Sequence, residues 1–262
     1  MKYIYQAAVI SAMFLLLCGC GEDSRGSEEL SDRSIDQPLT VGEIAVDNCN
    51  SQGYRICIEE NGDLVPFIVL TSNYNGYCLL LREGLLDDIV FYNVPGEYGS
   101  YYCGSNVDSF LNEDYYFRLS EKMQRLIVTT EVEITTKNAI DTHADDVETI
   151  MRNIFLLSAN EVNASLSRVA LKEGEPLSYF ENNERRIAAF RNLETGPWML
   201  RTPALRDGNT IVGVADNGMV GIGGINTIAG YSDSAVRPAF CIPIETPIMQ
   251  SDHAENIFVL KN

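Results

Sequence analysis

Pro197-Trp-Met-Leu-Arg-Thr-Pro203 opens the stretch of sequence that decides the fold, and Ala235-Val-Arg-Pro-Ala-Phe240 closes it. Between these two apolar segments lie turn dipeptides, among them Asp207-Gly208 and Asn217-Gly218. Asp-Gly and Asn-Gly favour the positive φ angles of tight hairpin turns, so the stretch is predicted to form several short antiparallel strands. Trp198, the only tryptophan of the chain, heads its apolar run and is predicted to lie in the core.

Two arginines, Arg201 and Arg237, each stand inside an otherwise apolar segment of this stretch that is predicted to be a strand. A charge that is buried without a partner is costly. We therefore expect each guanidinium to donate hydrogen bonds to loop carbonyls or to a carboxylate. Both arginines are assigned a structural role, and ligand binding is the alternative.

The first residues predict export and lipid anchoring. Lys2, an apolar run from Ala7 to Leu17 and the cleavage-type sequence Leu17-Cys-Gly-Cys20 are typical of a lipoprotein signal peptide. Residues 1–19 are thus predicted to be removed and Cys20 to be acylated, which anchors the chain to a membrane. Residues 20–40 are polar and acidic, and we expect them to form a flexible tether because they carry too little apolar surface to fold.

Residues 41–248 are predicted to form a single α+β domain of antiparallel strands with short helices, followed by a C-terminal tail over 249–262. Strand-like runs begin at Tyr54, Leu64 and Tyr77, and Asn-Gly turns separate them. Residues 54–81 should therefore form an antiparallel meander.

Apolar residues recur at helical spacing in several later segments. The pattern predicts helices over 107–115, from Ser120 onward, and over 147–155, with a strand over 127–134 between the last two. Residues 160–193 form the longest helix-prone region, although Gly174 and Pro176 interrupt it.

The chain is strongly acidic, with 37 acidic against 19 basic residues and a net charge of −18. Nucleic acid is a poor partner for such a protein, since its affinity comes from Lys and Arg that neutralise phosphates. The sequence therefore predicts a partner other than nucleic acid.

Five cysteines follow Cys20, and in an exported protein they could form disulfides. Because five is odd, at least one is unpaired or pairs outside the chain, and the connectivity stays open. They are Cys49, Cys57, Cys78, Cys103 and Cys241.

Four motifs in order resemble a family of bacterial extracellular domains of unknown function, over roughly residues 41–244. They are Leu111-Asn112, Phe155-Leu-Leu-Ser158, Trp198-Met-Leu-Arg-Thr-Pro203 and Val236-Arg-Pro-Ala239. The family has an arginine where this chain has Asp108, which reverses the charge at that position. The family in turn is similar to C-type-lectin-like and sulfatase-modifying-factor-like domains, so the resemblance implies a C-type-lectin-like arrangement of the α+β domain.

No motif for catalysis, metal or cofactor binding stands out. The chain has only two histidines, His143 and His253, and neither has a nucleophile in its local sequence. Zinc and EF-hand calcium patterns are absent from the sequence. Cys241 is predicted to be buried or disulfide-bonded, and we expect no catalytic residue, metal or cofactor.

We therefore expect a lipid-anchored protein of the cell envelope, at the outer membrane or cell surface, that binds a glycan or protein ligand without catalysis. Tyr and Gly suit adaptable recognition surfaces, which favours the turn-rich face. Its candidate residues are Tyr98, Tyr101, Tyr102 and Tyr231, with the loops 204–209 and 223–234. A glycan hydrolase with an Asp/Glu pair and a structural component of a surface assembly are the alternatives.

The anchor gives the first testable prediction. Replacing the acylated cysteine (Cys20→Ser) should abolish incorporation of radiolabelled palmitate, because the thiol is the acceptor. Equal labelling of the wild type and the variant would contradict the assignment of Cys20.

Overall fold

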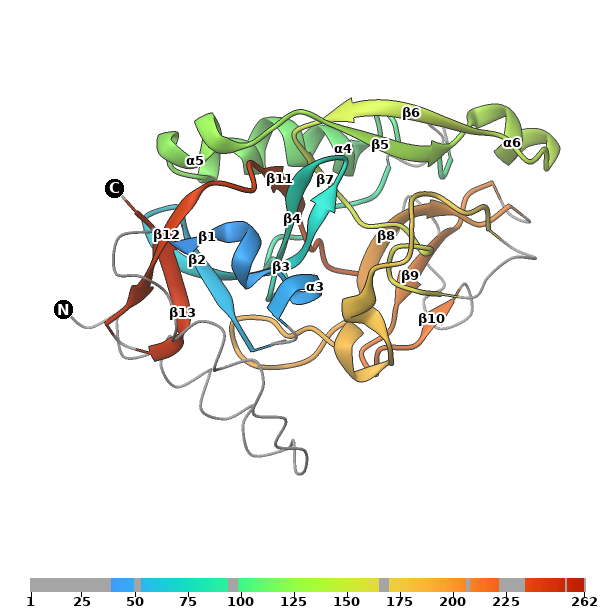
Figure 1. The fold of residues 1–262 in the computed structure, drawn as a ribbon. Helices are drawn as coiled ribbons and strands as arrows, with labels where there is room; N and C mark the ends of the chain where they lie inside the picture. The colour runs from blue at the N-terminus through green and yellow to red at the C-terminus, as the bar shows by residue number, and fades with distance from the viewer. Residues whose placement is uncertain are drawn as a thin grey trace.

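The computed structural model describes residues 39–49, 53–93, 99–164, 170–205, 208–221, 234–252 and 254–261 (Figure 1). The predicted signal peptide, Cys20, most of the tether and the side chain of Cys49 lie outside the described residues. In the described part, no helix is long and apolar enough to span a bilayer.

The predicted meander is confirmed and forms the centre of the main sheet. Strands β2 (Arg55–Glu60), β3 (Asp63–Tyr74) and β4 (Tyr77–Arg82) pair antiparallel in sequence order. Both connecting turns carry Asn-Gly with positive φ at each residue, 52° and 84° at the first turn and 52° and 83° at the second. These angles suit the right-handed twist of the flanking strands.

Five further strands extend the meander to an eight-stranded sheet with the order β1-β12-β13-β2-β3-β4-β11-β7. They are β1 (Leu39–Thr40), β7 (Ile154–Phe155), β11 (Ala239–Ile242), β12 (Pro247–Ser251) and β13 (Ala254–Leu260). The segment that was predicted to be a C-terminal tail is thus a hairpin of this sheet. Its strand β13 pairs in parallel with β2, and Phe258 buries its ring against Tyr54.

The stretch from Pro197 forms a second sheet, as predicted. Strands β8 (Trp198–Pro203), β9 (Ile211–Val214) and β10 (Val220–Gly221) pair antiparallel. Trp198 is fully buried and forms a parallel bridge with Ala235, which brings the closing segment back beside β8. In Figure 1 this sheet lies on the right and the main sheet on the left.

The helices are short, and side chains cap three of them. Ser105, Ser120 and Thr136 each accept a hydrogen bond from a backbone N–H at a helix start. The helices are α3 (Val46–Cys49), α4 (Asn106–Phe110), α5 (Glu121–Leu126) and α6 (Lys137–Thr142). The π turn η2 (Leu111–Tyr115) continues α4, and 3-10 turns are η1 (Val41–Ile44), η3 (Tyr116–Arg118), η4 (Ser178–Phe180) and η5 (Glu184–Arg186). The predicted helices over 107–115 and from Ser120 are therefore confirmed.

The helix predicted over 147–155 is wrong. Residues 147–152 form strand β6 (Val147–Arg152), which makes an antiparallel hairpin with β5 (Thr130–Thr135). Exposed and half-buried residues alternate along β6, as they do in a strand with one solvated face. The apolar residues that suggested a helical face belong to two different strands, because Ile154 and Phe155 lie in the main sheet.

The long helix-prone region over 160–193 also lacks a helix in its described part, where only the turns η4 and η5 occur. The Arg186 side chain supplies some of the hydrogen bonds to backbone carbonyls that a helix would otherwise provide. Its guanidinium donates to the carbonyls of Val162, Asn163 and Phe180. Gly174, with a φ of 68°, also requires a backbone conformation that is not helical.

Four of the five cysteines after Cys20 are free thiols: Cys57, Cys78, Cys103 and Cys241. Burial raises the pKa of the Cys57 thiol to about 11 and that of Cys78 to about 12. Disulfide pairing among these four is therefore not formed in this structure, and any pairing of Cys49 lies outside the described residues.

Two turn glycines allow a matched test of how tightly β9–β10 packs. Gly76 and Gly218 have φ angles of 83° and 79°, but a Cβ would touch nothing at Gly76 and would overlap the carbonyl oxygen of Asn183 at Gly218. Gly76→Ala should lower the free energy of unfolding by about 1–2 kcal/mol, the conformational cost alone. Gly218→Ala should lower the free energy of unfolding by roughly 1–3 kcal/mol more than Gly76→Ala does, because the backbone at Asn183 must move. Equal losses in urea unfolding would show that the β9–β10 turn does not press on Asn183.

Candidate functional site

Arg201 of β8 is the centre of a buried polar cluster. Its guanidinium binds the Glu161 carboxylate through both terminal nitrogens, at 2.6 Å and 2.8 Å, and neither side chain is exposed. It also donates to the carbonyls of Glu133 and Leu156, both at 2.8 Å. The Tyr74 hydroxyl donates to the same carboxylate at 2.6 Å. Arg201 thus has both kinds of partner that were expected, backbone carbonyls and the carboxylate of Glu161.

A second carboxylate, that of Glu173, lies 3.9 Å from Nε of Arg201 and is equally buried. It accepts hydrogen bonds from the backbone N–H and the hydroxyl of Thr135 and from the hydroxyl of Thr202. Burial raises the pKa of the Glu173 carboxyl, and Arg201 and the hydroxyl donors oppose that effect. Burial by itself would lower the pKa of Arg201, but Glu161, Tyr74 and Glu173 together outweigh it and the pKa is raised, so the guanidinium stays charged.

One predicted binding loop, residues 204–209, is hydrogen-bonded to the segment that carries the candidate tyrosines Tyr101 and Tyr102. The backbone N–H and the hydroxyl of Ser100 both donate to the carbonyl of Gly208, at 2.8 Å and 2.9 Å. The buried Tyr92 hydroxyl lies within hydrogen-bond distance of the carbonyls of Ser100 and Arg201. We call residues 99–103 and 208–210 the loop cluster. The Tyr92 hydroxyl thus links this cluster to the backbone of β8.

The predicted ligand-binding tyrosines that the structure describes lie in different environments. Tyr101 is half-buried in the loop cluster, and its hydroxyl donates to Glu148 of β6 at 2.7 Å. Tyr102 is 1% exposed, and its hydroxyl accepts the backbone N–H of Leu156, so its prediction as a ligand-binding residue is wrong. The two adjacent hydroxyls thus reach different parts of the protein, Tyr101 the hairpin strand β6 and Tyr102 the buried segment after β7. Tyr98 and Tyr231 lie outside the described residues, as do most of loop 223–234 and residues 206–207.

The sequence did not predict an ion pair beneath the loop cluster. Asp108 is buried, and its two carboxylate oxygens accept from Nε and Nη2 of Arg152, both at 2.7 Å. Arg152 Nη2 also lies 3.2 Å from the sulfur of the half-buried Cys103. Asp108 therefore has a partner of its own in this chain, on β6. The charge reversal at this position was the one sequence signal that could have suggested such a pair.

Arg237 was predicted to stand in a strand, but it lies in the irregular segment just before β11. It is buried beside Trp198, with its guanidinium carbon 5.0 Å from the centre of the indole. It donates to the carbonyls of Arg82 and Glu83, while its Nη1 has no hydrogen-bond partner among the described residues. Burial lowers the pKa of Arg237 to about 10. Its contacts are those expected of an arginine that holds loop carbonyls.

The side chains that could take part in catalysis differ in burial and in partners. Cys241 is buried, and burial raises the pKa of its thiol to about 12, which leaves it protonated at neutral pH. His143 is exposed at the end of α6, and His253 lies outside the described residues. Glu161 and Glu173 meet around Arg201, but both are 0% exposed, so a substrate cannot reach them. Among the described residues, no group of three or more His, Cys, Asp or Glu side chains is arranged to hold a metal ion.

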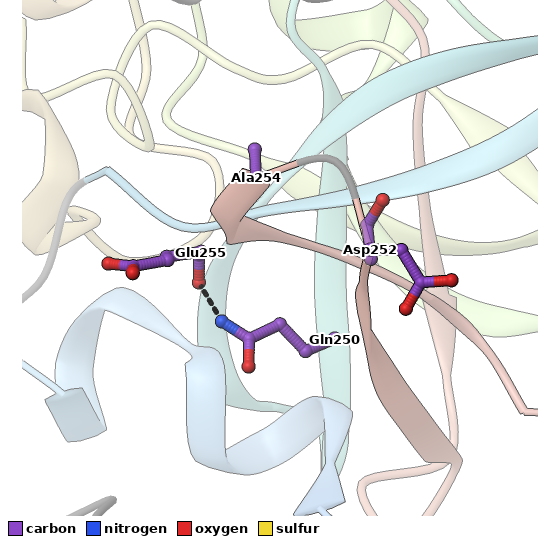
Figure 2. A pocket seen from close by; sticks show the side chains of 5 residues that line it. Gln250, Asp252, Ala254 and Glu255 are labelled. Carbon is purple, nitrogen blue, oxygen red and sulfur yellow. Dashed lines mark hydrogen bonds between the residues drawn. The ribbon is translucent and has the colours of Figure 1, made fainter.

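The tip of the β12–β13 hairpin holds an open depression of about 420 Å³. Figure 2 shows Gln250 reaching across it to the carbonyl of Glu255, to which its side-chain amide donates at 2.7 Å. The charged residues that line the depression, Asp252 and Glu255, are both acidic. Because one hairpin lines the depression, a ligand would contact little protein surface there, and we use the hairpin below as a control site.

A family model described as a domain of unknown function (DUF6273) matches residues 75–244, about two thirds of the chain. The matched region runs from the turn before β4 to just beyond β11 and includes Arg201, Glu161, Glu173 and the loop cluster. This confirms that the chain falls in a family of domains of unknown function. The comparisons match no curated protein and no solved structure.

Removal of the Arg201 guanidinium should strongly destabilise the fold. Arg201→Ala leaves the Glu161 carboxylate buried without its cation and should lower the free energy of unfolding by about 3–5 kcal/mol. The control is Arg191→Ala, which removes an ion pair whose side chains are 69% and 50% exposed and should cost less than about 1 kcal/mol. Similar losses for both variants in chemical denaturation would contradict the central role of Arg201.

Proposed function

This chain belongs to the DUF6273 family, and we propose that it is an exported, lipid-anchored protein whose α+β domain binds a ligand without catalysing a reaction. In this proposal Cys20 carries the lipid and residues 20–38 connect it to the first strand. The protein then acts at the cell envelope, on the outer membrane or the cell surface.

The observation that carries the proposal is the contact between Ser100 and Gly208. It joins two segments that are far apart in the sequence into one loop cluster. Binding residues are commonly placed on loops that a rigid scaffold positions, and here the scaffold is β8, whose residues are all buried and whose backbone Tyr92 links to the loop cluster. Such pre-ordering lowers the entropic cost of binding.

The nature of the available groups supports binding over hydrolysis. A glycosidase needs two accessible carboxyl groups across a cleft. The two glutamates that come together around Arg201 are instead saturated with internal hydrogen bonds. Tyr101 and its partner Glu148 offer an aromatic ring and a carboxylate at the loop cluster, a combination that suits the hydroxyl groups of a glycan or the polar surface of a protein.

The resemblance seen in the sequence supports a C-type-lectin-like arrangement as part of this proposal. A tryptophan strand, a turn-rich segment and a closing strand with an arginine follow one another here as β8, the segment with β9 and β10, and the segment of Arg237. Fold alone does not give function, so the binding site is argued from the loop cluster.

The test compares the loop cluster with the β12–β13 hairpin. On an array of envelope and host glycans, Tyr101→Ala combined with Asn209→Ala should weaken binding by at least about tenfold, since hot-spot side chains dominate affinity. Gln250→Ala combined with Glu255→Ala should leave it unchanged. For a protein ligand, a photo-crosslinking residue at position 101 should capture it and one at position 250 should not.

Loss of binding in the hairpin variant alone would contradict the placement of the site. Release of new reducing ends from a bound glycan would identify the chain as a hydrolase. Capture of the same envelope protein from both positions would favour a structural component of a surface assembly.

A further inference from the structure

The β5–β6 hairpin has two edges, and its hydrogen-bond register tells which residues face each of them. The backbone N–H of Thr136 donates to the carbonyl of Asp146, next to the pair Thr135–Val147. In an antiparallel ladder, pairs that exchange hydrogen bonds alternate with pairs that do not. Residues 146, 148, 150 and 152 therefore direct their backbone groups toward β5. Val147, Thr149 and Met151 direct theirs to the outer edge of β6.

Side chains from the rest of the protein close the edge on the β5 side. The carbonyl of Glu131 accepts from the Asn75 amide and that of Glu133 from Arg201. The N–H of Thr135 donates to Glu173. The Arg201 cluster thus satisfies the backbone of this edge.

The β6 edge is left open. Among the outward backbone groups of Val147, Thr149 and Met151, only the carbonyl of Met151 has a hydrogen-bond partner in the described part of the chain. That partner is the guanidinium of the neighbouring Arg152. The side chains of Val147 and Met151 lie on the solvent-facing side of the hairpin and are 41% and 52% exposed. In Figure 1, β6 runs along the upper margin of the molecule, with β5 below it.

Carboxylates surround this edge, and the one cation of β6, Arg152, is already paired with Asp108. Glu131 lies opposite Met151 on the same exposed face, and Asp145 precedes the strand. A third carboxylate is that of Glu148, whose side chain lies on the half-buried side of β6 and accepts from Tyr101. A strand that lay beside β6 would place alternate side chains next to Val147, Thr149 and Met151, within reach of these carboxylates.

We propose that the outer edge of β6 binds an extended, basic segment of a partner protein by β-strand addition. The partner's backbone would pair with Val147 and Thr149, its apolar side chains would cover Val147 and Met151, and its Lys or Arg residues would meet Glu131 and Asp145. The charge selects this occupant over a second copy of the chain, because two copies would bring like charges together on proteins of net charge −18. The inference is independent of the loop cluster and stands if that site is wrong.

The experiment uses the full chain and a synthetic peptide of about eight residues in which lysine and valine take turns at every second position and threonine fills the positions between them. Both kinds of side chain then share one face of the strand, as Val147, Met151 and Glu131 do. Binding is measured by fluorescence anisotropy at low and high salt. The matched probe is the same peptide with alternate backbone nitrogens methylated, which keeps its charge and side chains but removes the donors along one edge. The wild type should bind the parent peptide at least about tenfold more tightly than the methylated one.

Two variants locate the site. Thr149→Pro removes an N–H that points outward and places a ring on the edge, and it should reduce binding at least about tenfold. Thr149→Val keeps the backbone and should bind like the wild type. Glu131→Lys should weaken binding most at low salt.

Equal affinity for the parent and methylated peptides would overturn the proposal, because binding would then be electrostatic only. This comparison uses the wild type, so it holds even if Thr149→Pro fails to fold, which thermal denaturation would reveal. A folded Thr149→Pro variant with unchanged binding would also overturn it. A dimer of the wild type that Thr149→Pro dissociates would show that the occupant is a second copy.

Discussion

A positive charge inside an apolar strand constrains this fold more than any other feature. Arg201 stands in a β8 strand whose residues are all buried, and a guanidinium there must find anions and carbonyls or lose several kcal/mol, on the order of the cost of an unpaired buried charge. Its partners come from strand β5 and from the segment around Leu156 and Glu161. The second sheet, the hairpin and the loop between them therefore meet at one side chain.

The identity of the partners explains why the segment after Phe155 can remain irregular. Glu161 and Glu173 use their carboxylates to hold the backbone of Ser158 and Thr135 as well as Arg201. Arg186 holds three further carbonyls of the same region. Buried backbone groups must be satisfied, and here charged side chains perform what a helix or sheet would otherwise do. Gly174 is needed because a Cβ at this position would press on the Glu161 carboxylate.

Local signals in the sequence predicted local structure well. The Asn-Gly turns and the alternating runs around them were sufficient for the meander, since turn type and side-chain period are properties of a few neighbouring residues. The same method failed over 147–155, where the apolar spacing spans two strands that separate at Asn153. It also could not choose Glu161 and Glu173 from 37 acidic residues, because the choice depends on contacts distant in sequence. Tyr101 and Tyr102 look alike in the sequence, and only their orientation distinguishes a half-exposed ring from a buried one.

The Arg201 cluster also sets which edge of the β5–β6 hairpin faces outward. Because Arg201, Glu173 and Asn75 bind the backbone of β5, that edge is fixed against the body of the protein and β6 becomes the exposed strand. Exposed edges invite aggregation, and inward-pointing charges are one protection against it. Glu148 and Arg152 are such charges, and Tyr101 and Asp108 hold them in place. A strand that pairs with β6 must therefore tolerate a carboxylate beneath it and others beside it. Neutral or acidic strands are disfavoured at such an edge, whereas a basic one gains from the same charges.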